Sequence, residues 1–315
     1  MEYIHKSVML QQTLNWLDIK PGGTYIDATL GGAGHAAEIA RHLDGGALIG
    51  IDQDDFAIGK ARQALMPYTD KARILFEQAN FSQVARQMNE AQGFHADGIL
   101  MDLGVSSFQL DDVSRGFSYN HDARLDMRMN QNGKLTAHEV VNDYDMARLT
   151  QIFREYGEEK WAARIAEFIA RHREKSPVNT TQQLVDIIKA AIPKAARRDG
   201  PHPAKRVFQA IRIEVNDELG ILRGAIEDFV GILRPGGVIC IITFHSLEDR
   251  IVKETFRAMA ADCVCPREFP VCICDKQSEV EVLTKRPIAP CDDEIASNPR
   301  ARSAKLRVAR KIKEV

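Results

Sequence analysis

The sequence predicts an α/β fold, a mainly parallel β-sheet whose order along the chain is interrupted by an all-helical domain. Short apolar runs alternate with amphipathic stretches, and a glycine cluster follows the first run, which is the pattern of strands joined by helices. Between about residues 103 and 237 no strand-like run occurs, so we expect the helical insertion there. We assign residues 1–110 and 206–315 to the core and residues 111–205 to the insert.

The composition is that of a globular protein. The chain has 315 residues, of which 44% are hydrophobic and 27% charged, and its formal net charge is -2. No apolar run reaches the roughly 20 residues that span a bilayer, and the first ten residues lack a basic region followed by an apolar core. We therefore expect a cytoplasmic protein that does not bind membranes.

The first half of the chain predicts four strands separated by helices. A helix over 7–18 precedes the first strand, 24–29, and a glycine turn then leads into a helix that reaches about residue 43. The remaining elements of this half are strands over 47–51, 73–78 and 98–103, and helices over 55–66 and 82–91. Successive units of this kind form a parallel sheet with helices on both faces.

Polar or aromatic residues stand at or just beyond the ends of these four strands. They are Asp27, Asp52, Phe81 and Asp102. Because ligands of open α/β sheets bind outside the carboxyl ends of the strands, we expect one crevice to gather these side chains.

The glycine cluster of TYIDATLGGAGH, residues 24–35, limits the choice of ligand. It does not fit the G-x-G-x-x-G fingerprint, and it lacks the GK[ST] of a phosphate-binding loop. A short cluster after an acid suits a ligand without pyrophosphate, so we favour S-adenosylmethionine over NAD. In this hypothesis Asp27 lies near the ammonium group, Asp52 accepts the ribose hydroxyls and Phe81 covers the adenine.

The central part of the chain begins with a polar, irregular segment over 117–129, which is typical of a functional loop. The helices expected after it cover 145–157, 158–174 and 180–192. Asp145 is a suitable N-cap for the first of them, and Thr180 with Gln183 forms a capping box at the start of the third. These local signals predict helices only.

The α/β pattern resumes after one long amphipathic stretch over 210–237. A buried strand is expected over 238–244, followed by a helix with Ser246 as its N-cap and Asp249 three residues later. The last run, 303–312, alternates apolar and basic residues. It predicts a closing or edge strand with its charge on the solvent face.

Two basic stretches cover residues 194–206 and 300–313, and the second holds seven lysines and arginines without an acid. Each one alone is consistent with a solvated basic face. Two of them in a nearly neutral chain favour a polyanionic partner.

Five of the six cysteines lie between Cys263 and Cys291, and four of these form CVCPREFPVCIC, at Cys263, Cys265, Cys272 and Cys274. In a cytosolic protein such a cluster points to metal or redox chemistry before disulfides. However, C-x-C is tighter than the usual zinc-knuckle spacing. We expect a reduced, proline-braced loop without metal, with a zinc site as the alternative.

Eight segments resemble the bacterial small-subunit (16S) ribosomal RNA cytosine-N4 methyltransferases of the RsmH (MraW) family. They are TLGGAGH, DLGVSSFQLDD, RGFSY, LDMRM, RVFQAIRIEVNDEL, PGG, FHSLEDRIVK and NPRARSAKLRVA. They occur in order over nearly the whole chain, and DLGVSSFQLDD and FHSLEDR are specific to that family. The resemblance implies a Rossmann-like class I methyltransferase core with a helical substrate-recognition insert. It also implies methylation, with S-adenosyl-L-methionine, of N4 of a cytidine near the decoding centre.

The resemblance also assigns residues and a partner. The family's cofactor contacts fall on Ala33, Gly34, His35, Asp52, Phe81, Asp102 and Gln109. One departure is Phe108, where a proline is common in the family. The expected partner is 16S ribosomal RNA in the assembled small subunit, and the oligomeric state stays open.

Two residues, Asp102 and His245, are candidates for catalysis. The exocyclic amine of cytosine is a poor nucleophile, so methyl transfer needs alignment and a hydrogen-bond acceptor. Asp102 either accepts from the amine or only binds the cofactor, and the resemblance favours the second. His245 is either a polar group of the site or a histidine satisfied by the following helix. Candidates for stacking on a flipped base are Phe108, Phe117, Tyr119 and Phe244.

Three other functions compete with this one. A methyltransferase acting on DNA or on a small molecule would share the core, although the insert and the basic stretches speak against a small substrate. A non-catalytic RNA-binding module would keep only a relic of the crevice. A nicotinamide oxidoreductase is disfavoured by the broken glycine fingerprint.

Overall fold

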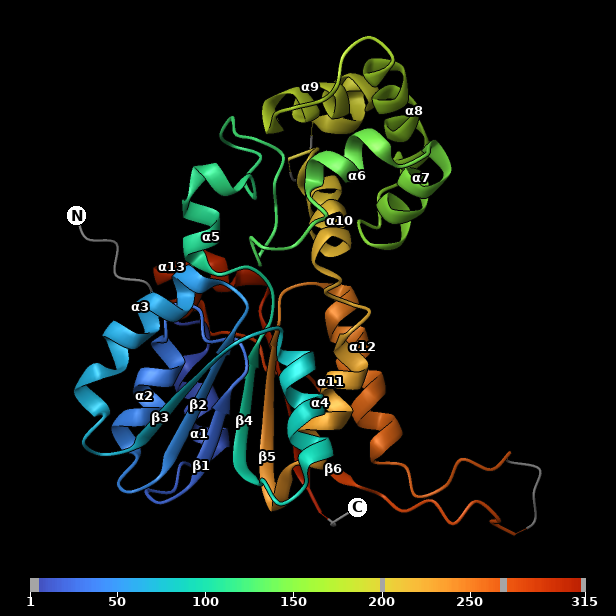
Figure 1. Ribbon diagram of the computed structural model, residues 1–315. Coiled ribbons are helices and arrows are strands. Elements are labelled where there is room, and N and C mark those ends of the chain that lie inside the picture. Colours follow the sequence, from blue (N-terminus) through green and yellow to red (C-terminus); the bar gives the residue numbers. More distant parts are fainter. Residues whose placement is uncertain (1–5, 199–201, 267–270, 313–315) are drawn as a thin grey trace. The chain divides into compact units, whose positions relative to one another are not determined.

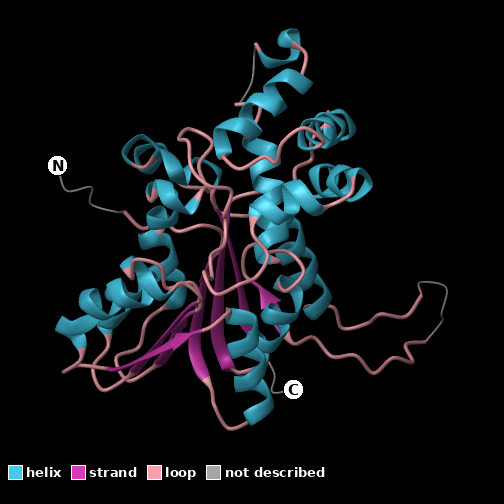
Figure 2. Cartoon of the chain, turned by 45° about the horizontal axis from the view of Figure 1, so that its top comes forward, coloured by secondary structure: helices cyan, strands magenta, loops and turns pink. Residues whose placement is uncertain are grey.

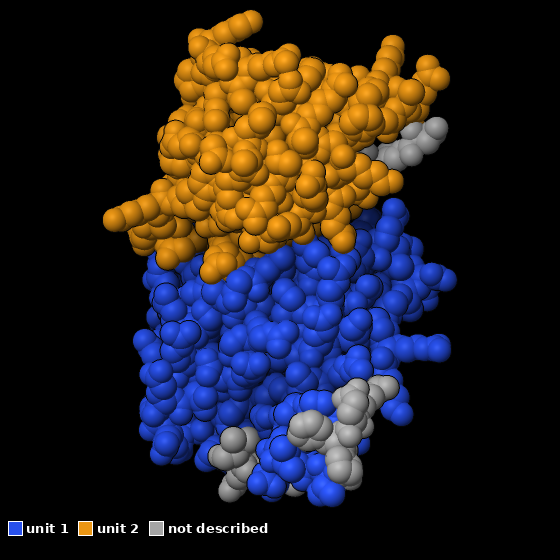
Figure 3. Space-filling model, turned by 90° about the vertical axis from the view of Figure 1, so that its right-hand side faces the viewer, with its two compact units in different colours: residues 1–104, 219–315 blue, residues 105–218 orange. Residues whose placement is uncertain are grey.

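The computed structural model describes residues 6–198, 202–266 and 271–312. The chain divides into two compact units, which Figure 3 colours blue and orange. The first comprises Met1–Gly104 and Leu219–Val315, and the second comprises Val105–Glu218. Each unit has a hydrophobic core of its own, as is typical of separate domains. No helix within the described ranges is long and apolar enough to cross a membrane.

The first unit is built on a seven-stranded sheet in the order β3-β2-β1-β4-β5-β7-β6 (Figure 1). The strands are β1 Thr24–Asp27, β2 Ala47–Asp52, β3 Arg73–Gln78, β4 Ala96–Asp102, β5 Leu233–Thr243, β6 Val280–Val282 and β7 Lys305–Lys311. Strands β1 to β5 pair in parallel, whereas β7 is antiparallel to β5 and to β6. The chain runs outward from β1 to β3 and returns to β4 on the other side of β1. The switch point between β1 and β4 is where such sheets bind ligands.

Both faces of this sheet are covered by helices, which explains the continuous apolar runs of the sequence (Figure 2). Tyr25 and Leu48 pack in one core, whereas their neighbours Ile26 and Ile49 pack in another, because successive strand residues point to opposite faces. Residues of α1, α2 and α3 contribute to the first core, and residues of α4, α11 and α12 to the second. These helices are α1 Leu10–Leu17, α2 Gly34–His42, α3 Asp55–Leu65, α4 Phe81–Ala91, α11 Leu222–Gly231 and α12 Ser246–Met259, and a short α13 covers Asp292–Ser297.

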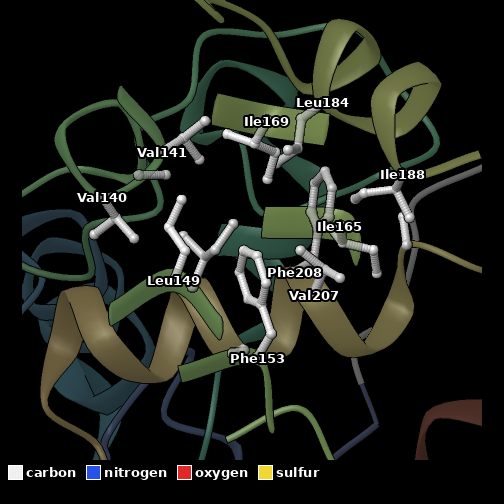
Figure 4. Packing of buried hydrophobic residues seen from close by; sticks show 14 of the residues in the cluster. Val140, Val141, Leu149, Phe153, Ile165, Ile169, Leu184, Ile188, Val207 and Phe208 are labelled. Carbon is white, nitrogen blue, oxygen red and sulfur yellow. The ribbon is translucent and has the colours of Figure 1, made fainter. Parts of the chain in front are cut away.

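The second unit is helical. Its helices are α5 Ser107–Asp111, α6 Ala137–Asp143, α7 Met146–Glu155, α8 Ala162–Arg173, α9 Thr181–Ala191 and α10 Lys205–Asn216. Buried side chains of α6 to α10 form one core, in which Phe153, Val207 and Phe208 lie close together (Figure 4). Within its described residues the only strand-type pairing is an isolated bridge between Arg124 and Thr180. The predicted fold class, an α/β core with an inserted all-helical domain, is confirmed.

The second unit extends beyond the expected insert, residues 111–205. Helix α10 belongs to it rather than to the core, because Val207 and Phe208 are buried among the other helices. The long amphipathic stretch over 210–237 is not continuous. Asp217 takes a left-handed conformation, with φ of 49°, and this residue ends α10 before α11 begins.

The C-terminal run over 303–312 was expected to keep its charge on the solvent face, and this expectation is wrong. Strand β7 lies between β5 and β6, and its basic residues Arg307 and Lys311 are only 5% and 1% exposed. Nε of Arg307 donates to Oδ1 of Asp249 at 2.6 Å, and Nζ of Lys311 donates to the carbonyl of Val230 at 2.7 Å. Each buried cation is therefore satisfied by a residue distant in sequence.

The basic stretch 300–313 is consequently not a free positive surface. Lys305 also pairs with Asp249, at 3.2 Å, and Arg310 pairs with Glu281 at 3.4 Å. Residue 313 of this stretch and residues 199–201 of the other basic stretch, 194–206, lie outside the described residues. Two of its seven cations are buried and two more are paired with acids, so the stretch 300–313 offers less free positive charge than the sequence suggests.

Candidate active site

Three carboxylates meet at the carboxyl edge of the sheet. Asp27, Asp52 and Asp102 are the last residues of β1, β2 and β4, which are neighbouring strands at the switch point. We call them the edge carboxylates. In the described part of the chain none of them forms an ion pair with a lysine or arginine. Asp102 lies within ion-pair distance of a histidine, His35. Buried acids without a cation are costly, and such a group in a crevice is a candidate binding site.

The turn after β1 is held in a conformation that presents backbone N–H groups. The N–H of Leu30 donates to a carbonyl of β2, which fixes the turn to its neighbouring strand. Gly31 and Ala33 both take left-handed conformations, with φ of 48° and 60°. A left-handed alanine costs roughly 1–2 kcal/mol, so the surrounding packing holds it there. The next residue is Gly34, where an added Cβ would lie 2.0 Å from Oγ of Ser7 and would require that side chain to move.

Asp52 is joined to this turn by a hydrogen bond. The N–H of Gly31 donates to its Oδ2 at 2.8 Å, and the N–H of Asp54 donates to its Oδ1 at 2.9 Å. Burial raises the pKa of Asp52 to about 6, an effect that these backbone donors reduce and that the charge of Asp54 increases. The acid and the glycine turn therefore form one connected structure.

Asp27 is the most deeply buried of the edge carboxylates. Its Oδ1 accepts from the N–H of Thr29 at 3.2 Å, inside the glycine turn. Burial raises the pKa of Asp27 to about 7, and the neighbouring charge of Asp52 contributes to the increase. Near neutral pH this carboxyl is consequently poised between its two protonation states.

Asp102 has an unsatisfied oxygen. Its Oδ1 is buried and has no hydrogen-bond partner among the described residues, although 23% of the side-chain surface is exposed. Burial raises the pKa of Asp102 well above its ordinary value, and the charges of Asp27 and Glu248 raise it further. Its Oδ2 lies 3.8 Å from Nδ1 of His35, whose Nε2 lies 3.0 Å from the carbonyl of Val8. An unpaired buried carboxylate oxygen can accept a hydrogen bond from a ligand.

Helix α12 begins one residue earlier than expected, which corrects the assignment of Ser246 as N-cap. His245 is the cap: its Nδ1 accepts from the N–H of Glu248 at 3.4 Å, and Oε2 of Glu248 accepts from the N–H of Phe244 at 2.8 Å. Asp249 cannot serve in this box because it pairs with β7. Nε2 of His245 lies 3.1 Å from Oε1 of Glu248, but without hydrogen-bond geometry.

Glu248 is the site residue that the sequence analysis missed. It is buried, and its charge contributes to the raised pKa of Asp102. The available signal was the spacing His-x-x-Glu at residues 245 and 248, which is a capping box with histidine in the place of serine. His245 does satisfy the following helix, as one of the two alternatives proposed, and a catalytic role for it stays a prediction.

Comparison with known proteins identifies the family. Residues 2–312 match the model of the MraW methylase family. The chain belongs to this family. It is 56% identical to the "Ribosomal RNA small subunit methyltransferase H" of Acetivibrio thermocellus and 53% identical to the protein of that name from Clostridioides difficile. Each match extends over 313 residues, which are 99% of this chain and the full length of the relative.

Membership of the MraW methylase family confirms the predicted enzyme class, a methyltransferase, and S-adenosylmethionine as its cofactor. The edge carboxylates fit that molecule, because it carries a sulfonium and an ammonium group. Acids whose pKa values are raised by burial and mutual repulsion become stabilised in their ionised form when a cation binds beside them. The unpartnered Oδ1 of Asp102 provides a further acceptor.

Phe81 stands near the same edge in this MraW-family chain. It is the first residue of α4, and its neighbour Asn80 caps that helix. Nδ2 of Asn80 donates to Oε1 of Gln53 at 3.4 Å, which links the end of β3 to the residue after Asp52. Phe81 is partly buried and packs against the core of this sheet face, and its assignment to the adenine stays a prediction.

Gln109 belongs to the second compact unit. Its backbone N–H donates to Oγ of Ser106 at 3.2 Å, and its Oε1 accepts from the N–H of Ser106 at 3.0 Å. These two bonds form the capping box of α5. The buried side chain therefore has a structural role, and its assignment to the cofactor stays a prediction.

The aromatic candidates for base stacking differ in their environments. Phe117 is buried in the helical core, beneath the guanidinium of Arg115. Tyr119 already stacks on His202, with ring centroids 4.6 Å apart. The remaining candidates, Phe108 and Phe244, are partly exposed.

Proposed function

We propose that this chain transfers the methyl group of S-adenosylmethionine to N4 of a cytidine in small-subunit (16S) ribosomal RNA, near the decoding centre. The observation that carries the proposal is the buried Oδ1 of Asp102, which has no hydrogen-bond partner in the described part of the chain. The backbone N–H of the same residue donates to Oγ1 of Thr29, in the turn after β1. The relatives named as small-subunit ribosomal RNA methyltransferases, at more than half identity over their full length, support ribosomal RNA as the substrate.

The proposed cofactor site combines the glycine turn with the edge carboxylates. It comprises Ala33, Gly34, His35, Asp52, Phe81, Asp102 and Gln109. When bound, S-adenosylmethionine supplies an electrophilic methyl group on a sulfonium cation. Asp52 accepts hydrogen bonds from the ribose hydroxyls, Phe81 covers the adenine, and Asp27 balances the charge of the ammonium group.

The proposed chemistry depends on the protonation of Asp102. Its ionised carboxylate accepts a hydrogen bond from the N4 amine, which orients the amine and increases its electron density. A cation in the site favours this ionised form, opposing the effect of burial on its pKa. His245 is the second candidate. Its ring is fixed by the cap of α12, so it can present a polar group without rearranging.

The proposed RNA contacts lie in the helical unit, Val105–Glu218. A substrate embedded in a ribosomal particle requires a recognition surface separate from the cofactor site, and an inserted domain is a suitable carrier for it. We propose the assembled small subunit as the natural substrate and the cytoplasm as the location of the reaction.

The decisive experiment uses small subunits from a strain that lacks this protein. They are incubated with the purified full chain and isotope-labelled S-adenosylmethionine, and the labelled nucleoside is mapped by mass spectrometry. We expect one labelled cytidine, methylated at N4, near the decoding centre. Parallel reactions with free 16S ribosomal RNA and with DNA determine the substrate.

Subunits from the unmodified strain are the matched control, because their target cytidine is already methylated and they should accept no label. Label at C5, on a ribose or on another base would contradict the N4 assignment. Transfer to DNA but not to either RNA substrate would favour the competing DNA methyltransferase.

A further inference from the structure

Four cysteines converge in the segment that joins α12 to β6. Cys263 and Cys265 lie seven or more residues away from Cys272 and Cys274, and no helix or strand in the described residues connects the two pairs. Nevertheless the four Sγ atoms all lie within 4.8 Å of one another. We propose that these thiols form a closed four-cysteine site for one structural zinc ion.

The distances between the sulfur atoms match the geometry of tetrahedral zinc. With Zn–S bonds of about 2.3 Å, a regular tetrahedron separates its sulfur atoms by about 3.8 Å. Sγ of Cys272 lies 3.4 Å from that of Cys263, 3.9 Å from that of Cys265 and 3.6 Å from that of Cys274, and Cys263 and Cys274 are 3.9 Å apart. A disulfide would require about 2.05 Å, so the four thiols are arranged around a common point and not in bonded pairs.

Backbone N–H groups point at these sulfurs. The N–H of Val264 donates to Sγ of Cys274, that of Cys265 to Sγ of Cys263, and that of Ile273 to Sγ of Cys265, each at 3.4 Å. Donors of this kind stabilise metal-bound thiolates and orient them. They also explain how two cysteines separated by one residue can both bind the same ion, because the backbone of each C-x-C pair folds around the sulfurs.

The described residues of this segment, 260–266 and 271–279, bury little apolar surface. Its apolar side chains Val264, Val271 and Ile273 are between 64% and 70% exposed, so they do not form a core. A metal ion is the usual substitute when a short segment cannot bury enough apolar surface. Binding replaces the four thiol protons, which pass to solvent, and no redox step is involved.

The position of the cluster makes its role structural. Helix α12 starts at the carboxyl edge of the sheet and spans 14 residues, which is about 21 Å, before the segment begins. The segment then enters β6 at Val280, which pairs with Lys311. This pair lies at the amino ends of the parallel strands, whereas the edge carboxylates lie at their carboxyl ends. With four protein ligands the site also has no open position for a substrate.

The test is metal analysis of the full chain, purified under reducing conditions and also reloaded with zinc after chelation. We expect about one equivalent of zinc per chain. Cys272→Ser should lower it at least about tenfold, whereas Cys291→Ser, at an exposed cysteine outside the cluster, should leave it unchanged. Cobalt added to the chelated protein should give the visible absorption of a tetrahedral ion and a thiolate charge-transfer band.

Each alternative outcome is distinguishable. No metal uptake by the reloaded wild-type chain, or cobalt absorption without thiolate character, would overturn the proposal. Disulfides within the freshly purified cluster, found by mass spectrometry, or one equivalent of iron in place of zinc, would also overturn it. The cobalt spectrum of the wild-type chain decides the question even if Cys272→Ser fails to fold, and it is independent of methyltransferase activity.

Discussion

The edge carboxylates and Asp249 are aspartates of the first unit that have opposite electrostatic environments. The edge carboxylates lack lysine and arginine partners among the described residues, and burial raises the pKa of all three. Asp249, in the first turn of α12, is paired with Arg307 and Lys305, and hydrogen bonds and charge from these cations lower its pKa in spite of burial.

The difference separates acids that stabilise the fold from acids that are reserved for a ligand. Pairing and hydrogen bonds offset the desolvation of Asp249, and the pair joins α12 to β7. The edge carboxylates cost free energy in the ligand-free protein, and a bound cation removes that cost. Four substitutions test this comparison.

The largest expected effect concerns the pH dependence that Asp27 gives to stability. Because its pKa rises from 3.8 unfolded to about 7 folded, the folded state binds the proton more tightly. The stabilisation from protonation is complete below pH 3.8 and is lost as the pH rises through about 7. The loss is at most about 4 kcal/mol, at about 1.4 kcal/mol per pKa unit.

Urea unfolding of the ligand-free wild type and of Asp27→Asn across this pH range measures the effect. As the pH rises, the free energy of unfolding of the wild type should fall relative to that of Asp27→Asn. A difference that is independent of pH would show that Asp27 has an ordinary pKa. Asp249 has the opposite sign: its lowered pKa gives stability above pH 3.8 that is lost as the pH falls.

The second effect is the loss of a paired acid. Asp249→Asn leaves the buried guanidinium of Arg307 without its carboxylate, which should lower the free energy of unfolding by about 3 kcal/mol. The matched control is Glu281→Gln, because the exposed pair of Glu281 with Arg310 contributes at most about 1 kcal/mol. Equal losses in the two variants, measured by urea unfolding, would remove the structural role of the buried pair.

The third effect is on catalysis. Asp102→Asn should lower turnover at saturating cofactor about 100-fold, because a neutral amide is a weaker acceptor for the N4 amine. Asp70→Asn provides a control at an exposed acid outside the edge. Turnover is measured on small subunits and affinity by calorimetry. If affinity falls and turnover at saturating cofactor survives, Asp102 only binds the cofactor.

The smallest of the four expected effects concerns the affinity for the cofactor. Asp52→Ala removes an acceptor for the ribose hydroxyls and should weaken S-adenosylmethionine about 30-fold, which is about 2 kcal/mol. Asp55→Ala, at the next exposed acid along the chain, should bind normally. Calorimetry that finds the same dissociation constant for Asp52→Ala and the wild type would rule out the ribose assignment.

The sequence predicted most of the α/β core. Strand β3 was predicted at its observed bounds, residues 73–78, and β1, β2 and β4 within two residues. These elements depend on local patterns, since apolar runs bounded by glycine, proline or an acid specify a buried strand without information from the rest of the chain. Strand β6 was missed because its three residues are too few to show a period.

The limits of local patterns appear in the C-terminal third. The alternation of basic and apolar residues in β7 predicts one charged face, yet Arg307 and Lys311 are buried there. Their partners, Asp249 and Val230, are 58 and 81 residues distant in the chain. No window of sequence contains both members of either pair, so the charge pattern alone indicated a solvent face.

The sequence by itself determined the order of the elements and placed an aspartate at the end of β1, β2 and β4. It also carried the motifs that identify the family. Tertiary structure decided which acids acquire cations and which stay unpaired, and it brought Cys263 and Cys265 to Cys272 and Cys274. The reason is physical: secondary structure is specified by neighbours within one or two turns, whereas the pKa of an acid and the ligands of a metal depend on residues brought together only by folding.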